Sequence, residues 1–343
     1  MAMIPDRQRQ WTVAARPARR ALADGDFALV EAPVGRPAPG QVLLRATLLE
    51  FAPAQKSWME NAAAYRHPVE IGGVMPGNGA GEVVASADPR FAVGDVVAGP
   101  IGWQEFPLVD ADELRAVPAG VAPAAALSTL GTSGRTAYAG LFLVGEVKAG
   151  DTVLVSGAAG AVGTLVGQMA RLAGARTIGI AGGADKCDWI VREVGYDAAI
   201  DYRGGEVKRR LRELAPGGVD VMFDNVGGEV LNDALARLAP GARVVICGGI
   251  ARYNHDPRDR AAMPEGPRNY FNLVATGSRM QGFVVYQYRH RFAEIDRRLA
   301  GWLRAGRLVP HEDMQAGFEN APATLRRLFE GANRGKQLLR IGD

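Results

Sequence analysis

A glycine-rich loop between an apolar strand-like run and an amphipathic segment constrains the fold of this chain more than any other feature. Residues 152–156 (TVLVS) predict a strand, the loop GAAGAVG follows, and residues 162–172 predict a helix. Against the dinucleotide pattern G-x-G-x-x-G, Ala158 stands in the first glycine position, whereas Gly160 and Gly163 occupy the other two. Gly160 lets the backbone approach a pyrophosphate, and Gly163 lets the helix pack closely on the strand. The pattern predicts a dinucleotide site; the alternative is a structural turn in another kind of α/β protein.

Apolar runs continue to alternate with helical segments after this loop. Crossover connections of this length produce parallel strands, and continuous apolar strands are typical of a sheet that is covered on both faces. The sequence therefore predicts an α/β fold with a Rossmann, doubly wound parallel sheet. The predicted strands are 152–156, 177–181, 198–201, 219–224 and 244–247, and the predicted helices are 162–172, 186–194, 206–214 and 229–238.

The first 125 residues have a different pattern, because proline and glycine break their apolar runs. The runs at 42–49, 81–87 and 93–99 predict strands, and the closely spaced turns between them are typical of a small β-barrel. Beyond the parallel sheet, residues 291–303 and 321–329 predict helices without a further βαβ unit. We expect this tail to return to the first domain.

Composition narrows the class of protein. Of 343 residues, 48% are hydrophobic and 22% charged, which is typical of a globular chain, and a net charge of +3 is too small to argue for nucleic-acid binding. Two cysteines, Cys187 and Cys247, exclude a disulfide framework and a cysteine-based structural zinc site. The N-terminal residues lack the apolar core of a signal peptide, and no apolar run reaches membrane-spanning length. We expect a cytoplasmic protein with neither membrane nor nucleic-acid partners.

The second strand of the predicted sheet indicates which nicotinamide cofactor is bound. An NAD site usually ends this strand in Asp or Glu, which holds the ribose 2′-hydroxyl. Here residues 177–181 are followed by two glycines, and Lys186 comes shortly afterwards, where a cation can meet a 2′-phosphate. Tyr202 ends the next strand and is expected beside the adenosine. The sequence therefore favours NADP(H) over NAD(H), although Lys186 alone is also compatible with a surface position on a helix.

With these features in place, the chain resembles the zinc-independent medium-chain dehydrogenase/reductases, in particular the prostaglandin reductase and bacterial curcumin reductase group. The resemblance extends over nearly the whole sequence, and the phrases are specific to the family only in combination. They are RQW at Arg9, PGQVLLR at Pro39, FAVGD at Phe91, TLGTSGRTAY at Thr129, VSGAAGAVG at Val155, DNVGG at Asp224, CGGIARYN at Cys247, QGFVVY at Gln281 and GANRGK at Gly331.

The resemblance implies a GroES-like β-barrel catalytic domain over residues 1–128, an NADP-binding Rossmann domain over 129–298, and a segment 299–343 that returns to the catalytic domain. It also implies NADPH-dependent reduction of the C=C bond of α,β-unsaturated ketones and aldehydes by a homodimer. Carried over position by position, it implies cofactor contacts at Gly160, Ala161, Val162, Gly163, Lys186, Tyr202, Asn225, Cys247, Gly248, Gly249, Ile250, Tyr253, Phe283, Val284, Val285 and Asn333.

One segment departs from the family. Relatives usually carry Asp-Pro-x-x-Arg near the substrate, whereas this chain reads Ala52-Pro53-Ala54-Gln55-Lys56. The acid is missing and lysine replaces arginine, which leaves the identity of the substrate open.

The available side chains limit the chemistry. A zinc alcohol dehydrogenase needs Cys and His ligands in its first domain, and this domain contains His67 and no cysteine. The remaining route is hydride transfer from a nicotinamide to the β-carbon of an enone, with a hydrogen-bond donor for the developing enolate oxygen. Tyr253 and Tyr65 are the candidate donors, although each can instead be a packing aromatic.

Other interpretations stay open at this point. Quinone reduction and metal-free alcohol/ketone conversion use the same cofactor, and an NADPH-binding sensor or scaffold needs no turnover. A stretch rich in apolar side chains is compatible with a strand and dimer core or with an apolar wall for a hydrophobic substrate. Its members are Tyr270, Phe271, Met280, Phe283, Tyr286 and Tyr288.

Overall fold

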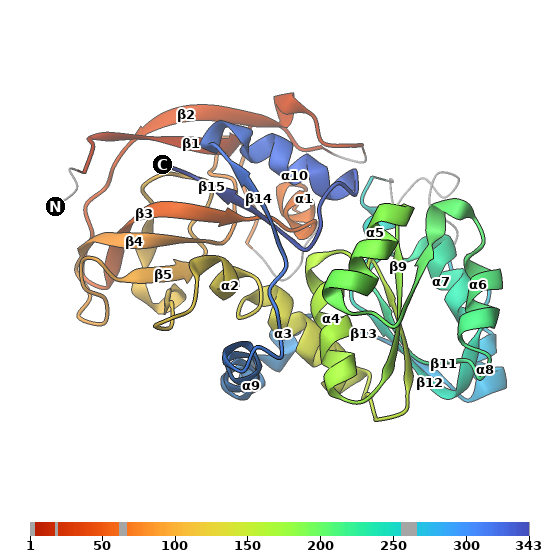
Figure 1. The fold of residues 1–343 in the computed structure, drawn as a ribbon. Helices are drawn as coiled ribbons and strands as arrows, with labels where there is room; N and C mark the ends of the chain where they lie inside the picture. Colours follow the sequence, from red (N-terminus) through yellow and green to blue (C-terminus); the bar gives the residue numbers. More distant parts are fainter. Residues whose placement is uncertain (1–3, 18–19, 62–66, 255–265, 343) are drawn as a thin grey trace. The chain divides into compact units, whose positions relative to one another are not determined.

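The computed structural model describes residues 4–17, 20–61, 67–254 and 266–342, which divide into two compact units (Figure 1). Unit 1 comprises residues 1–127, 312–332 and 337–343, and unit 2 comprises residues 128–311 and 333–336. The chain therefore leaves unit 1, completes most of unit 2, and then contributes to both. The functional domain limits predicted at residues 128 and 298 stay a prediction.

Unit 2 is built on a six-stranded sheet with the order β10-β9-β8-β11-β12-β13, and each hydrogen-bonded pair of neighbours is parallel. The chain starts at the centre with β8 and builds outward first to one side and then to the other, which is the Rossmann order. The predicted doubly wound sheet is confirmed. Its strands are β8 (Thr152–Ser156), β9 (Arg176–Ala181), β10 (Ala198–Asp201), β11 (Val219–Asp224), β12 (Leu238–Ile246) and β13 (Arg279–Gly282).

Helices cover both faces of this sheet, as its continuous apolar strands require (Figure 1). On one face, α6 and α7 pack on a cluster that includes Leu154, Ile178 and Met222. On the other face, helical residues cover Gly179 and Phe223, because Ile190 packs against the first and Gly140 against the second. The helices of unit 2 are α3 (Thr132–Tyr138), α4 (Ala161–Leu172), α5 (Ala184–Trp189), α6 (Val207–Leu214), α7 (Gly228–Leu235), α8 (Asn272–Thr276) and α9 (Phe292–Arg304).

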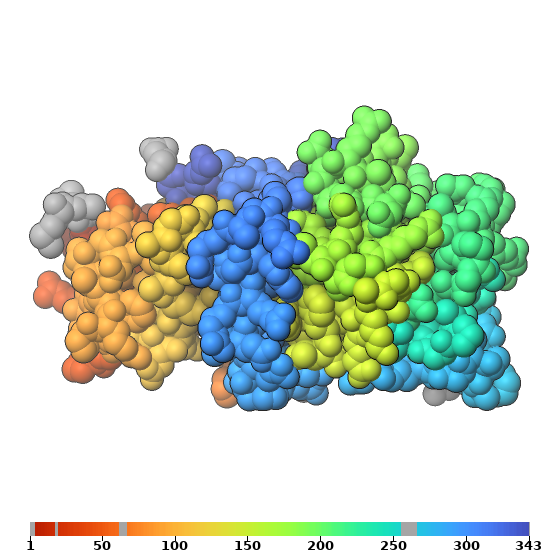
Figure 2. Space-filling model, turned by 60° about the horizontal axis from the view of Figure 1, so that its bottom comes forward, coloured from red at the N-terminus to blue at the C-terminus, as the bar shows by residue number. Residues whose placement is uncertain are grey.

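Helix α9 packs on α3 at the surface of unit 2 and is seen in blue in Figure 2. A bidentate ion pair joins the guanidinium of Arg135 on α3 to the carboxylate of Asp296 on α9, with distances of 2.7 and 2.6 Å. The same guanidinium lies over the ring of Phe292. These contacts hold α9 to the rest of unit 2.

Unit 1 is an antiparallel β structure. Its seven-stranded sheet has the order β14-β15-β3-β4-β5-β7, with β6 paired to β3, and β1 and β2 form a separate ribbon. The strands are β1 (Arg7–Val13), β2 (Phe27–Pro33), β3 (Gln41–Glu50), β4 (Gly79–Ser86), β5 (Val96–Gly99), β6 (Leu108–Asp110), β7 (Arg115–Ala116), β14 (Glu312–Ala316) and β15 (Lys336–Arg340). Its helices are α1 (Ala54–Met59), α2 (Pro123–Leu127) and α10 (Ala321–Phe329).

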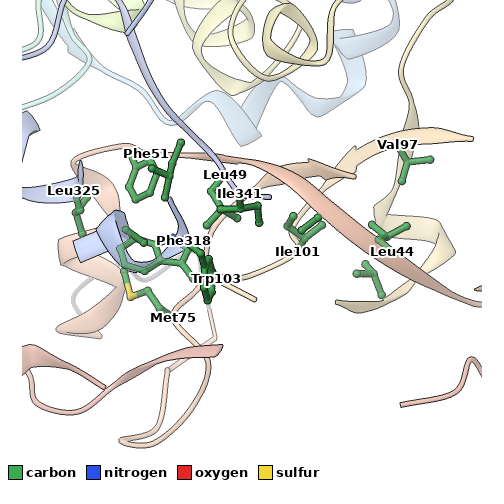
Figure 3. Packing of buried hydrophobic residues seen from close by; sticks show 14 of the residues in the cluster. Leu44, Leu49, Phe51, Met75, Val97, Ile101, Trp103, Phe318, Leu325 and Ile341 are labelled. Atoms are coloured by element: carbon green, nitrogen blue, oxygen red, sulfur yellow. The ribbon is translucent and has the colours of Figure 1, made fainter. Parts of the chain in front are cut away.

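An aromatic cluster forms the centre of this unit (Figure 3). The fully buried Trp103 stacks on Phe27 at 5.6 Å between ring centroids and lies 5.1 Å from Phe51. Phe318 and Leu325, from the later part of the chain, complete the same cluster. Chain segments from both sides of unit 2 in sequence therefore share one hydrophobic core.

Most predicted element limits in unit 2 agree with the structure to within two residues, and the larger differences lie between α7 and β12. Strands 152–156, 198–201 and 219–224 are confirmed at their predicted limits. The helix predicted to reach residue 238 ends at Leu235, and the strand predicted to start at 244 starts at Leu238. Leu238 pairs with Val219 across a register shift, so long-range pairing overrides the local helical pattern.

Candidate functional site

The glycine-rich loop connects β8 to α4 with a tight turn. A Cβ atom on Gly163 would lie 2.3 Å from the carbonyl oxygen of Gly157, so only glycine permits this approach of helix and loop. Gly157 itself has a φ of 60°, in the left-handed region. Helix α4 begins at Ala161, and its first N–H groups lack partners within the helix. The turn therefore presents backbone donors and the positive end of a 12-residue helix, which suits a diphosphate.

Alanine in the first glycine position has a local explanation. Ala158 is fully buried, and its methyl group faces Gly179 on the neighbouring strand β9, where a Cβ would lie 2.8 Å away. The N–H of Ala158 donates to the carbonyl of Ile180. The missing side chain at Gly179 therefore accommodates the methyl group at Ala158, and the loop keeps its hydrogen bond to β9.

The second strand leads into the Gly182–Gly183 turn, and Lys186 lies on the short helix that follows. The ammonium of Lys186 donates to the backbone carbonyl of Asn333 at 2.6 Å. The side chain of Asn333, in turn, donates to the carbonyl of Gly335 at 2.8 Å. Residues 333–336 belong to unit 2, so the structure brings two predicted cofactor residues from distant parts of the sequence together.

Tyr202 lies on the other side of this turn. It directly follows β10, and a Cβ on Gly182 would be only 2.8 Å from its ring, so the tyrosine covers the end of β9. Its side chain is 46% exposed, which leaves ring surface for a ligand. Tyr202 and Lys186 thus flank the turn at which the adenosine half of a dinucleotide ends in this fold.

A buried polar network forms the floor of the site at the carboxyl ends of β8 and β11. Asp224 is fully buried; it accepts a 2.6 Å hydrogen bond from the hydroxyl of Ser156 and further bonds from the backbone N–H groups of Val226 and Gly227. Burial raises the pKa of Asp224 above its ordinary value. Sequence reasoning used only Asn225 of this motif and missed Asp224, although an acid at the end of a central strand was a visible indication.

The loop after β12 joins this floor. The carbonyl of Asp224 accepts hydrogen bonds from the N–H groups of Cys247 and Gly248, and the carbonyl of Asn225 accepts one from Ile250. The side chain of Asn225 donates to the carbonyl of Ser156 at 2.8 Å. The structure therefore brings together the predicted residues Asn225, Cys247, Gly248, Gly249 and Ile250 beside the phosphate loop.

The residues predicted after β13 differ in exposure. Phe283 donates its N–H to Ile246 and packs edge-on against Tyr288, with ring centroids 6.3 Å apart. Val284 is 37% exposed, whereas Val285 is buried.

Of the two tyrosines predicted to donate a hydrogen bond to the substrate oxygen, the structure describes only Tyr253. Tyr253 is half-buried, and its N–H donates to the carbonyl of Ile250 at the end of a 3₁₀ turn beyond β12. The carboxyl ends of parallel strands are where ligands bind in this kind of sheet. Tyr65 lies outside the described residues.

The segment that departs from the family pattern is held inside unit 1. The ammonium of Lys56 is fully buried and forms an ion pair with Glu60 at 2.5 Å. Gln55, which is 1% exposed, donates to the carbonyl of Pro76 and accepts from the N–H of Ala52. Both side chains therefore stabilise helix α1 and the loop beside it.

The two thiols are poor nucleophiles. Burial raises the pKa of Cys187 to about 11 and that of Cys247 to about 12, so both are protonated at neutral pH. Among the described residues, no three His, Cys, Asp or Glu side chains gather closely enough to hold a metal ion. Within the same residues, no helix combines the length and apolar character needed to cross a membrane.

Known proteins match the chain over nearly its whole length. Residues 9–117 match a family described as the N-terminal domain of oxidoreductase, and residues 161–301 match one described as zinc-binding dehydrogenase. NADPH-dependent curcumin reductase of Escherichia coli is 37% identical over 100% of both chains. The NADP(+)-dependent 2-alkenal reductase of Nicotiana tabacum is 34% identical over 88% of this chain and 87% of its own. The crystal structure of CurA from Vibrio vulnificus in complex with NADPH superposes with a TM-score of 0.89 at 36% identity, covering 98% of this chain and 99% of the other.

Proposed function

Because this chain belongs to the NADP-dependent oxidoreductases of the medium-chain dehydrogenase/reductase family, we propose that it reduces the C=C bond of α,β-unsaturated ketones and aldehydes with NADPH. The observation that carries the proposal is the combination of the glycine cradle with a turn after β9 that has Lys186 and no acidic residue at its tip. The relatives named for curcumin and 2-alkenal reduction support the class of reaction.

The residues present fit the cofactor. Gly160, Ala161, Val162 and Gly163 would hold the diphosphate with backbone N–H groups, and Lys186 with Tyr202 would hold the phosphorylated ribose. The loops that contain Asn225 and residues 247–250 would line the nicotinamide half, together with residues 283–285. Asn333 would lie between Lys186 and the phosphate loop, to which its segment is hydrogen-bonded.

Hydride is the chemistry that NADPH supplies when bound, and it enters at the β-carbon of the substrate. The protein has to stabilise the charge that develops on the carbonyl oxygen, and a tyrosine hydroxyl does so by donating a hydrogen bond. We assign this role to Tyr253, with Tyr65 as the second candidate, because Tyr253 lies beyond the carboxyl end of β12. Because burial raises the pKa of the Cys247 thiol, we assign it no nucleophilic role in the reaction.

We also propose a cytoplasmic homodimer acting on a small hydrophobic enone or enal. Support for the dimer comes from β13, the last strand in the sheet order, whose four residues are all exposed. Large apolar side chains are exposed on and near it, including Met280 at 37%, Phe271 at 68% and Val274 at 70%. A second copy of this chain would remove that apolar surface from water.

The test combines NADPH consumption with product analysis. Purified protein is mixed with NADPH and a panel of enones and enals, and the nicotinamide absorbance is followed while products are identified by mass and proton spectra. A saturated ketone or aldehyde is expected. An allylic alcohol would show carbonyl reduction, reaction only with quinones would show a quinone reductase, and tight NADPH binding without turnover would favour a sensor or scaffold.

A further inference from the structure

One cation beside the cofactor turn has a side chain without a partner among the described residues. The guanidinium of Arg203 makes no hydrogen bond or ion pair with any described residue. Other arginines nearby are engaged, such as Arg209 with Glu206 and Glu213, and Arg171 with the carbonyl of Gly195. Since Arg203 is also exposed, its five donors are available to a ligand.

The position of this guanidinium is defined by two glycines. A Cβ on Gly182 would lie 3.1 Å from Nε of Arg203, and one on Gly183 would lie 3.8 Å from Nη1. These glycines form the turn between β9 and α5, and Lys186 lies one turn further on. The arginine therefore lies over the very turn that lacks an acid for a ribose 2′-hydroxyl.

Backbone hydrogen bonds fix Arg203 relative to that turn. One carboxylate oxygen of Asp201 accepts hydrogen bonds from the N–H of Gly183 at 2.8 Å and from the N–H of Arg203 at 2.9 Å. The residues that follow Asp201 form a 3₁₀ turn, 202–204. The carboxylate of Asp201 thus holds the two backbone segments together through their N–H groups and makes no bond to the guanidinium.

We propose that Arg203 determines cofactor specificity, binding the 2′-phosphate of NADPH with its guanidinium while Lys186 neutralises the same group from α5. A 2′-phosphate carries more charge than one ammonium cancels, and a guanidinium adds a planar fork that matches phosphate oxygens. Arg203 has no ion pair with another described residue that must break before it binds a phosphate, so that cost does not offset its contribution. This assignment deepens the proposed function and rests on NADPH as its reductant.

The experiment measures binding rather than turnover. Kd values for NADPH and NADH are obtained from nicotinamide fluorescence for the parent, Arg203→Gln and Arg203→Lys, with 2′-AMP and 5′-AMP as competing fragments. The matched control is Arg212→Gln, because Arg212 is likewise exposed, lies on α6 and has no side-chain partner among the described residues. The control removes the same charge from the same unit.

Arg203→Gln is expected to raise the Kd for NADPH and for 2′-AMP by about tenfold or more, with the Kd for NADH within about twofold of the parent. The NADPH Kd of Arg203→Lys should lie between those of the parent and Arg203→Gln. Arg212→Gln should leave the Kd values for NADPH and NADH unchanged. Equal weakening of NADPH and NADH, or an unchanged NADPH Kd, would overturn the inference. NADH binding also reports whether a variant is folded. A parent protein that binds NADPH but reduces no enone would contradict the proposed function and leave the assignment of Arg203 standing.

Discussion

The ammonium of Lys186 is hydrogen-bonded at 2.6 Å to the backbone carbonyl of Asn333, a residue 147 positions further along the chain. From there the contacts continue inward, because Asn333 donates to Gly335 and the N–H of Gly335 donates to the carbonyl of Ala159 at 2.7 Å. The cation expected at the 2′-phosphate and the loop expected at the diphosphate are thereby tied to one short segment.

Lys186→Ala is expected to weaken NADPH binding by about 1.5–3 kcal/mol, the usual contribution of a hydrogen bond to a charged group. NADH should be affected far less, since it has no 2′-phosphate. The measurement is a fluorescence titration with each nucleotide. If the variant bound NADPH as tightly as the parent, the assignment of Lys186 to the 2′-phosphate would be wrong.

Gly163→Ala is expected to destabilise the protein and to weaken the binding of NADPH and NADH equally. The added methyl group would meet the carbonyl oxygen of Gly157 at 2.3 Å, so helix and loop must separate, at a cost of about 1–3 kcal/mol. Urea unfolding and the two Kd values provide the check.

The matched control for Gly163 is Gly301→Ala on α9, where a Cβ meets nothing within 4 Å. Removing glycine from a helix interior at an open position should stabilise the protein by about 0.5–1 kcal/mol. A Gly163→Ala variant as stable as this control would contradict the tight packing of loop and helix.

Tyr253→Phe is expected to lower kcat by about 10–100-fold with an unchanged Kd for NADPH, because it removes only a donor to the developing oxyanion. Tyr270→Phe serves as the control, since Tyr270 is 61% exposed on the outer part of unit 2. Parallel measurements on Tyr65→Phe decide between the two candidates. Full activity in Tyr253→Phe would remove it from the chemistry.

Asp224→Asn is expected to change how stability depends on pH. Burial raises the pKa of Asp224 in the folded state, so the folded protein binds this proton more tightly than the unfolded chain does. Its contribution to the free energy of unfolding is therefore greatest at low pH and is lost as pH rises from about 4 through the raised pKa. Relative to Asp224→Asn, the parent should lose stability with increasing pH, which urea titrations between about pH 4 and pH 8 measure; a constant difference would contradict it.

Met280→Lys is expected to shift the protein towards monomer, because a charge on exposed β13 opposes burial of that edge against a second copy. Val93→Lys is the control, since Val93 is 55% exposed in unit 1. Light scattering over a range of protein concentrations distinguishes the two. A parent that is monomeric at every concentration would rule out the dimer.

The parallel sheet was predictable because its information is local. Strands such as Thr152–Ser156 and Val219–Asp224 are largely apolar runs that end at glycine or a polar residue. Such runs can be recognised without knowing which strands lie beside them in the sheet. The start of β12 at Leu238 was not predictable, because only its pairing with Val219 makes that stretch a strand. The ribbon of β1 and β2 depends on distant pairing in the same way.

For the candidate site, the sequence predicted which residues bind the cofactor but not which of them contact one another. Lys186 and Asn333 were both expected at the cofactor, yet no pattern indicated that they touch each other. Lys56 stood out as a departure, and only the fold reveals that its charge is neutralised inside unit 1 by Glu60. Arg203 was not predicted as a cofactor residue, because the sequence does not show which of its many arginines lack a side-chain partner.

The placement of residues 333–336 in unit 2 also sets an order of events during protein synthesis. A ribosome adds Asn333 long after the phosphate loop and Lys186, so the Rossmann unit of a nascent chain lacks residues 333–336 until translation has passed them. The hydrogen bond from Lys186 to the carbonyl of Asn333 therefore forms only after that point, which makes it a late contact in the assembly of unit 2.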